Sequence, residues 1–332
     1  MNDYLSDYKG KSILITGGAG CVGSNLTKAL VKAEAAKIIV LDDLSAAESW
    51  NIPAAPNVLF IKGSVLDEEV LKRVFSHHLD FVFHLAAHFA NQNSVDNPET
   101  DLLVNGLGIL KVLQYSHLTK VSKFVFASSG CSVYGSQAPL PLKEDFVSLH
   151  LDTPYQITKL LGELYCNFFS NYYSLPVVIA RYFNVYGPGE IPGTYRNVIP
   201  NFIWRALHRK PLPLTGTGEE TRDFTFVEDV VEGTLLAGAV PEAIGEAFNL
   251  ASGTETRIMD IANIINETTG NHNRVDFLAR RDWDKIVRRR ASIEKARKVL
   301  GYEPKTQIKD GIKKTHDWIV ENQKRIEARV RF

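Results

Sequence analysis

A glycine-rich segment near the amino terminus constrains the fold of this chain more than any other feature. It reads TGGAGCVG over residues 16–23, follows an apolar run at 11–16 and opens an amphipathic stretch at 21–34. Its glycines satisfy both the GxGxxG and the GxxGxxG spacings. Such glycines allow a tight turn and a close backbone approach to an anion, and the helix start supplies N–H groups. Residues 11–42 are therefore predicted to form a strand–turn–helix–strand unit that binds a phosphate-containing ligand.

An acidic pair at the end of the next apolar run completes this pattern. Asp42 lies nineteen residues beyond Gly23 and is followed by Asp43, where a carboxylate can accept hydrogen bonds from ribose hydroxyls. A carboxylate there repels the extra phosphate of NADP, so NAD is the predicted cofactor. The alternative is a simple turn with a solvated acidic pair. The cofactor-binding residues predicted from this unit are Gly17, Gly20, Cys21, Val22, Gly23, Asp42 and Asp43.

The order of apolar runs and helical stretches predicts the fold class. Short runs are continuously apolar, as buried parallel strands are, at 11–16, 38–41, 58–61, 81–83, 124–127 and 177–180. Helices are expected near 21–34, 67–77, 98–118 and 153–173, and later near 195–208, 228–238, 256–268, 292–300 and 308–325. Strands that alternate with helices in this way specify an α/β fold, a Rossmann-type doubly wound parallel sheet.

The texture of the sequence changes after Arg181, where glycine- and proline-rich loops separate shorter elements. We expect these elements to form a smaller mixed α/β substrate domain at the carboxyl edge of the sheet, where ligands bind in such folds. The predicted NAD-binding domain spans 1–183, with a returning segment near 224–250. The predicted substrate-binding domain combines 184–223 and 251–332.

Composition argues against several classes of function. Lys and Arg number 38 and so do Asp and Glu, so no net charge favours a nucleic-acid or membrane partner. Cys21, Cys131 and Cys166 are odd in number and widely separated, so neither a disulfide framework nor a metal site is expected. The first nine residues lack the apolar core of a signal peptide, and no apolar run has the length of a membrane span. We therefore expect a cytoplasmic protein.

A tyrosine and a lysine four residues apart form the candidate catalytic pair. Tyr155 and Lys159 follow Thr153 and Pro154, which suit the N-cap and the first turn of a helix. A spacing of four places the phenol and the ammonium on one helix face. The ammonium, helped by a positive nicotinamide, is expected to lower the tyrosine pKa from about 10 and make it a general base. Taken alone, the spacing also fits an ordinary surface pair.

Together these motifs resemble the extended short-chain dehydrogenase/reductase family, in its group of nucleotide-sugar epimerases, dehydratases and decarboxylases. The resemblance runs nearly end to end and implies an NAD-dependent enzyme acting on a sugar nucleotide. It is carried by TGGAGCVG at 16–23, LDD at 41–43, HLAA at 84–87, Asn105 with Gly106, SSGCSVYG at 128–135, Tyr155 with Lys159, RYFNVYGP at 181–188, RDF at 222–224, VEDV at 227–230, and KAR with LGY within 295–302.

The resemblance implies further contacts to the cofactor. Lys159 would hold the nicotinamide ribose, and Ser64 and Val65 would lie against the adenine, although the family usually has Asp where Ser64 stands. The remaining residues assigned to the cofactor on this basis are Leu85, Ala86, Ala87 and Asn105.

The resemblance also implies contacts to the substrate. Asn184 and Arg222 resemble the residues that grip the diphosphate of the sugar nucleotide, with Arg281 as a second clamp. The alternative for Arg222 is a solvated loop charge, but the guanidinium fork suits phosphate well.

One catalytic position departs from the family pattern. Gly130 stands where the family has a Ser or Thr whose hydroxyl bonds the sugar oxygen. Ser129 or Ser132 would replace that hydroxyl, because each is a better donor than Cys131, or Tyr155 would act alone. Cys131 itself could move a proton, as in some 3,5-epimerising relatives, or be a small packing residue.

The two positions before the VYG motif, Cys131 and Ser132, also discriminate among reactions. Dehydratases of the family have Asp-Glu there and decarboxylases commonly have Glu at the second position, whereas this chain has no carboxylate. The predicted function is therefore a UDP-hexose 4-epimerase that passes through a transient 4-keto sugar. The alternatives are a UDP-glucuronate decarboxylase, another nucleotide-sugar oxidoreductase or dehydratase, and a non-catalytic NAD-binding sensor.

Two of the predicted helices, near 98–118 and 153–173, carry apolar residues expected to face outward, among them Leu160, Leu164 and Phe168. The equivalent helices form a dimeric four-helix bundle in this family, so the resemblance implies a homodimer. The alternative is that these residues pack on the sheet. His88 precedes a loop, 89–94, that is expected to face the sugar, and its role is open.

Overall fold

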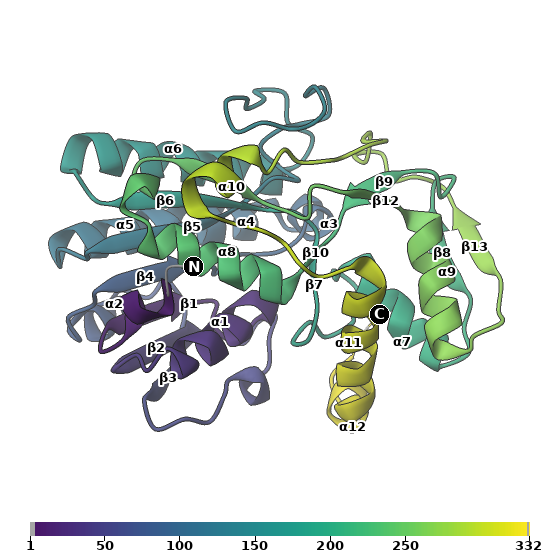
Figure 1. Cartoon of the computed structure of the whole chain (residues 1–332), viewed down its shortest axis with the longest axis horizontal. Coiled ribbons are helices and arrows are strands. Elements are labelled where there is room, and N and C mark those ends of the chain that lie inside the picture. Colours follow the sequence, from purple (N-terminus) through teal and green to yellow (C-terminus); the bar gives the residue numbers. More distant parts are fainter. Residues whose placement is uncertain (1–3, 331) are drawn as a thin grey trace.

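A parallel sheet of seven strands forms the centre of the computed structural model, which describes residues 4–330 and 332 (Figure 1). The strand order is β11–β6–β5–β4–β1–β2–β3. The strands are β1 (Ser12–Thr16), β2 (Lys37–Asp42), β3 (Val58–Lys62), β4 (Phe81–His84), β5 (Lys123–Ser129), β6 (Val177–Tyr182) and β11 (Ala247–Leu250). The predicted Rossmann-type sheet is confirmed, and β11 is a further strand that none of the predicted apolar runs included.

Helices cover both faces of the sheet, which explains why its strands are apolar on both sides. Ile13 and Ile15 of β1 belong to one core, whereas Leu14 between them belongs to the other. The first core is covered by α1 (Cys21–Lys32), α8 (Val227–Ala239) and the 3₁₀ turn Tyr4–Tyr8, and the second by α2 (Glu68–Phe75), α5 (Gly108–Leu118) and α6 (Pro154–Tyr173).

The helix predicted near 98–118 is divided. A proline opens α4 (Pro98–Asp101), and a π-helical turn, Leu102–Leu107, separates it from α5. Ahead of it, α3 (Asn91–Asp96) forms within the segment that we expected to be a loop. Inside the π turn, the Asn105 amide donates to Asp101 at 2.8 Å and accepts from the His88 N–H at 2.8 Å. The turn therefore fastens the segment after β4 to the helical layer.

A smaller lobe lies beyond the carboxyl ends of the strands, on the right of Figure 1. It combines helices with short two-stranded sheets, as the expected mixed α/β texture requires. The sheets pair β8 (Leu212–Thr215) with β13 (Val275–Leu278), β9 (Thr221–Asp223) with β12 (Glu255–Arg257), and β7 (Val185–Tyr186) with β10 (Thr225–Phe226). The helices are α7 (Val198–Leu207), α9 (Ile258–Thr269), α11 (Ile308–Glu321) and α12 (Gln323–Glu327), while α10 (Glu294–Leu300) packs beside β11.

The register of the sheet gathers the segments that follow the strands. Thr16 at the end of β1 is paired with Leu41 on one side and with His84 on the other. Ser129 at the end of β5 is paired with Tyr182. Because the strands are parallel, the turns after β1, β2, β4, β5 and β6 all open at one edge, which faces the smaller lobe. Among the described residues, no helix has the length and apolarity that crossing a bilayer requires.

Candidate active site

A cleft of about 690 Å³ separates the carboxyl edge of the sheet from the smaller lobe. Nearly all of the predicted site residues line it. They are Gly17, Gly20, Cys21, Val22, Gly23, Asp42, Asp43, Ser64, Val65, Leu85, Ala86, Ala87, Ser129, Tyr155, Lys159, Asn184, Arg222 and Arg281. Asn105 and Ser132 do not line the cleft, and both lie buried behind its surface.

At two glycines of the turn after β1, Gly17 and Gly23, the neighbouring backbone leaves no space for a side chain. Gly17 has a φ of +69°, and a Cβ there would lie 2.7 Å from the backbone nitrogen of Ala86. A Cβ on Gly23 would lie 2.5 Å from the carbonyl oxygen of Gly17. Gly20 is the N-cap of α1, so the unpaired N–H groups of its first turn open onto the cleft. The arrangement is a backbone cradle of the kind that holds a dinucleotide diphosphate.

Asp42 lies beside this cradle because β2 pairs with β1. Its Oδ2 accepts from the Ala19 N–H at 3.0 Å and its Oδ1 from the Leu44 N–H at 2.8 Å. These bonds fix the carboxylate and leave lone pairs for ribose hydroxyls. Asp43 is exposed and accepts from the backbone N–H of Ser45 at 2.8 Å. The cradle and the fixed carboxylate together fit NAD.

The predicted adenine end of the cleft is formed by the segment after β3. The Ser64 hydroxyl accepts from the Leu66 N–H at 3.2 Å, so this side chain closes a local turn. Val65 is buried and packs on the helical layer at Gly108. Asn105 acts from behind, because its bonds to His88 hold the backbone beside Leu85–Ala87 rather than reaching the cleft.

Tyr155 and Lys159 lie in the first turns of α6 and are both buried at the cleft. Thr153 caps this helix, as its position predicted, and the Ser94 hydroxyl accepts from the Tyr155 N–H at 3.0 Å. The Lys159 ammonium donates to the Ala127 carbonyl at 2.8 Å and lies 5.6 Å from the centre of the Tyr155 ring. The two side chains therefore share one helix face beside the end of β5.

In the chain by itself burial dominates the pKa of Tyr155, so the lowering expected from the ammonium and a positive nicotinamide together stays a prediction. Burial raises the pKa of Tyr155 well above its ordinary value, and Asp101 and Cys131 raise it further. Burial also lowers the pKa of Lys159 to about 8. A phenolate at this position therefore depends on additional positive charge, of the kind that an oxidised nicotinamide carries.

An aromatic ring occupies the space of the missing hydroxyl at position 130. A Cβ on Gly130 would lie 2.0 Å from the Phe183 ring, so neither Ser nor Thr fits there without displacing it. Next to it, Ser129 lines the cleft and accepts a hydrogen bond from the buried Ser132 hydroxyl at 3.0 Å. Burial raises the pKa of Cys131 and keeps it a neutral thiol. Ser129 is thus the hydroxyl that a ligand can reach, with Ser132 orienting it.

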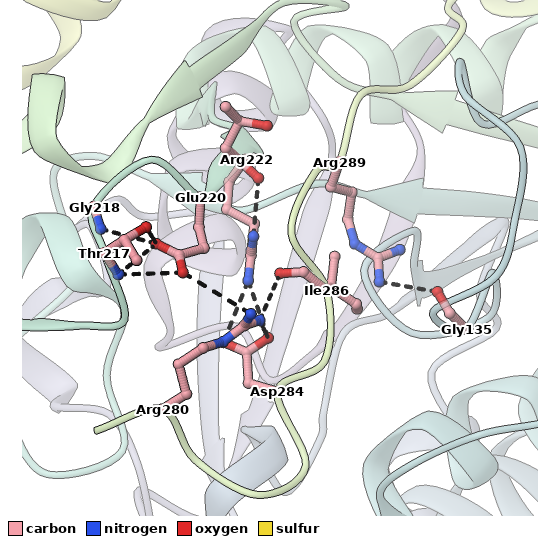
Figure 2. Close-up of polar contacts among 10 residues, drawn as sticks. Gly135, Thr217, Gly218, Glu220, Arg222, Arg280, Asp284, Ile286 and Arg289 are labelled. Atoms are coloured by element: carbon pink, nitrogen blue, oxygen red, sulfur yellow. Dashed lines mark hydrogen bonds and ion pairs between the residues drawn. The ribbon is translucent and has the colours of Figure 1, made fainter. Parts of the chain in front are cut away.

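The predicted diphosphate clamp is ion-paired within the chain (Figure 2). Arg222 of β9 lies with its Nη2 3.1 Å from Asp284 Oδ1, and Arg280 approaches the same carboxylate at 3.8 Å. Asn184, which has a φ of +33°, donates from its amide to the Asp223 carbonyl at 3.1 Å. Arg281 lies 5.7 Å from the centre of the Trp283 ring. These side chains reach the cleft from separate loops and strands.

Sequence reasoning missed the strap formed by residues 282–289. Trp283 donates from its Nε1 to the side-chain oxygen of Gln92 at 2.9 Å, and this contact spans the cleft. Asp284 and Arg289 also line the cleft, as does His88, whose Nε2 is buried without a partner among the described residues. The run of three arginines, Arg288–Arg290, was a visible signal of a basic segment. Nothing in the sequence, however, distinguishes the buried Arg289 from its two neighbours.

Comparisons with known proteins agree with this geometry. The UDP-glucose 4-epimerase of Mycolicibacterium smegmatis is 34% identical over 305 residues, which cover 91% of this chain and 96% of that protein. The structure of the epimerase Mth375 from Methanothermobacter thermautotrophicus is 57% identical, with a TM-score of 0.98 and coverage of 99% and 98%. The enzyme WbmF of Bordetella bronchiseptica, solved with NAD⁺ and UDP, is 39% identical, with a TM-score of 0.86 and coverage of 97% and 96%.

Residues 13–251 match the sequence profile of the NAD dependent epimerase/dehydratase family. This match spans the glycine turn, the Tyr155–Lys159 pair and Arg222, so the predicted cofactor and enzyme class are confirmed at the level of the family. The profile ends before the strap at 282–289, where the sequence reasoning was also weakest. On the fold, the cleft and these matches, the chain belongs to the NAD dependent epimerase/dehydratase family.

Proposed function

We propose that this protein is a UDP-hexose 4-epimerase that uses NAD as an internal hydride carrier. The observation that carries the proposal is the position of the buried Tyr155–Lys159 pair. It lines the same cleft as the diphosphate cradle of the glycine turn and Arg222. A phenol that shares a cleft with a dinucleotide site and a sugar-diphosphate site is suited to removing a proton from a sugar hydroxyl.

Proton transfer in this proposal belongs to side chains of the cleft. Tyr155 takes the proton of the 4-hydroxyl, and the Lys159 ammonium beside its ring stabilises the phenolate. NAD, held by the glycine turn and Asp42, would supply the hydride acceptor and donor at C4 of the sugar. Ser129 bonds the sugar oxygen in place of the hydroxyl absent at Gly130, and Ser132 holds Ser129 in position.

The diphosphate is the pivot about which the keto sugar turns. Arg222 exchanges Asp284 for the phosphate oxygens, for which its planar fork is suited. Asn184 and Arg281 line the same cleft and complete the clamp. Holding the substrate by its diphosphate leaves the sugar free to present either face.

Epimerisation is better supported than elimination of water or loss of carbon dioxide. The positions that supply a catalytic carboxylate in related dehydratases and decarboxylases are Cys131 and Ser132 here. The first is a neutral thiol and the second a buried hydroxyl engaged with Ser129. Neither can serve as a carboxylate acid or base.

The purified protein loaded with NAD tests this proposal. It is incubated with UDP-glucose, UDP-galactose, their N-acetyl forms and UDP-glucuronate, and the products are separated by chromatography. We expect interconversion at C4 with at least one of these sugars and no net formation of NADH. Failure to interconvert any of them would contradict the proposal, and release of carbon dioxide from UDP-glucuronate would identify a decarboxylase instead.

The proposal extends to the organisation of the chain. Residues 1–183, with the returning segment near 224–250 that supplies α8 and β11, hold NAD, and residues 184–223 and 251–332 hold the substrate. The enzyme works in the cytoplasm, whose reducing conditions suit the free thiols of Cys21, Cys131 and Cys166.

We also propose a homodimer formed through α6 and the neighbouring π turn. These two elements pack together and expose a group of apolar side chains: Leu102, Leu103, Leu107, Ile157, Leu164, Phe168 and Tyr172. Leu160, which we expected to face outward, lies in the core, so the prediction for that residue is wrong. Sedimentation equilibrium tests the proposal. The parent protein should be a dimer and the Phe168→Glu variant a monomer, and a monomeric parent would contradict the proposal.

A further inference from the structure

Arg289 is a buried cation at the cleft that the proposed reaction does not use. Its side chain is 2% exposed, and the residue lines the cleft. Its Nη1 donates to the Gly130 carbonyl at 3.0 Å and its Nη2 to the Gly135 carbonyl at 3.2 Å; Figure 2 shows the second of these contacts. A guanidinium has five N–H donors, so two of the five are engaged by these carbonyls.

The charge of Arg289 has no counter-ion within the described residues. The other deeply buried arginine, Arg181, forms two hydrogen bonds of 3.0 and 2.8 Å with the Glu163 carboxylate. No carboxylate of the described residues lies within ion-pair distance of Arg289. Burial is the main reason why the pKa of Arg289 is lowered, and Arg222 lowers it further, whereas Cys131 and Asp284 act in the opposite direction without offsetting burial. Burying an unpaired charge is costly, so a guanidinium kept in this position is suited to an anion that enters the cleft.

The contacts of Arg289 place it on the sugar side of the cleft. It holds the loop that follows β5, which contains Cys131 and lies next to Ser129. The charge of Arg289 lowers the pKa of the Cys131 thiol against the larger effect of burial, so the two side chains are neighbours. Arg222, in contrast, is already matched to an anionic partner at the predicted diphosphate site. The two arginines therefore differ in their partners, a carboxylate for Arg222 and two backbone carbonyls for Arg289.

We infer that Arg289 binds a carboxylate carried by the hexose, so that the substrate is a nucleotide-activated uronic acid rather than a neutral sugar. The inference rests on the proposed function for the orientation of the sugar at Tyr155. A carboxylate accepts two parallel N–H bonds from a guanidinium, and the donors of Arg289 that face no carbonyl are available for it. Arg289 then determines specificity, while Tyr155 performs the proton transfer.

Binding to a protein that cannot turn over tests the inference. The Tyr155→Phe variant, saturated with NAD, is titrated in a calorimeter with UDP-glucuronate, UDP-glucose and UDP. We expect UDP-glucuronate to bind about 10- to 100-fold more tightly than UDP-glucose, as a charge-assisted bidentate pair allows. Adding Arg289→Met should abolish this preference and leave the affinity for UDP within a few-fold. Arg289→Lys should retain part of it, because the charge remains but the fork is lost.

Arg288→Met is the matched control, because Arg288 is exposed and ion-paired with Glu255. It should keep the full preference. An equal loss of affinity for all three ligands in Arg289→Met would assign Arg289 to the diphosphate and overturn the inference, as would a parent protein with no preference. If Arg289→Met does not fold, the parent preference and Arg289→Lys still decide. A carboxylate preference without any C4 interconversion would leave this inference standing and overturn the proposed function.

Discussion

The two walls of the cleft are built by different means. The cofactor wall, residues 17–23, 42–43, 64–65 and 85–87, consists of turns that directly follow parallel strands. The substrate wall combines residues that follow β5 and β6 with side chains from the short sheets and loops of the smaller lobe: Ser129, Cys131, Asn184, Arg222, Arg281, Trp283, Asp284, Ile286 and Arg289. In the proposed function, backbone N–H groups and the Asp42 carboxylate of the first wall hold the cofactor, and charged side chains of the second wall hold the substrate.

This difference affects how each wall is held in place. At the cofactor wall, Gly17 and Gly23 bring three backbone segments into contact, and the surrounding core fixes them. At the substrate wall, the position of Arg222 is set by its ion pair with Asp284, on a strap that itself depends on the contact of Trp283 with Gln92. The cofactor wall is therefore preorganised, whereas the substrate wall can exchange partners when a substrate binds.

Replacing Tyr155, which lines the cleft together with both walls, should produce the largest effect. Tyr155→Phe removes the proton acceptor and leaves both walls intact, so kcat should fall by about 10³-fold or more. The dissociation constants for NAD and UDP, measured by calorimetry, should stay within about twofold. Unchanged turnover would mean that the protein's reaction does not involve this phenol, and it would revive the alternative of an NAD sensor.

The pH dependence of stability should reveal the lowered pKa of Lys159, the buried lysine beside Tyr155. Lys159 titrates at about 8 in the folded chain and near about 10.4 when unfolded. Between these values the unfolded chain binds more protons, so the contribution of Lys159 to stability rises with pH. Relative to Lys159→Met, the wild type should gain up to about 3 kcal/mol of unfolding free energy from pH 8 to 10.5. Denaturant titrations at each pH measure this, and a difference that does not change with pH would contradict it.

Adding a side chain at a glycine of the cofactor wall should weaken the binding of NAD. A Cβ on Gly23 would lie 2.5 Å from Gly17 O, so Gly23→Ala should weaken NAD binding by about 100-fold through displacement of the cradle. The rise in thermal midpoint on adding NAD reports this affinity. Gly301→Ala is the control, because Gly301 also has a positive φ of +70° but its Cβ would meet open space. It should lower the midpoint yet keep the full NAD-induced rise.

The same contrast explains how far the sequence could predict the site. The glycine turn, Asp42 and the Tyr155–Lys159 pair are local patterns, because the backbone around each is fixed by the strand or helix that contains it. Arg289 and Asp284 are not local, since their roles depend on contacts with residues more than 60 positions away, Gly130 and Arg222. The loss of the hydroxyl at Gly130 was visible in the sequence, but the Phe183 ring that fills the space beside it was not.

The smallest effect should come from freeing the diphosphate clamp. Asp284→Asn removes the charge that Arg222 must exchange before it can bind phosphate. Because this pair is only partly buried, with side chains 16% and 23% exposed, its loss should tighten UDP binding by about three- to tenfold and leave NAD binding unchanged. Asp282→Asn is the matched control, because Asp282 is an exposed neighbour on the same strap. Weaker UDP binding in Asp284→Asn would instead show that Asp284 positions Arg222 for phosphate. In that case the substrate wall would be as preorganised as the cofactor wall.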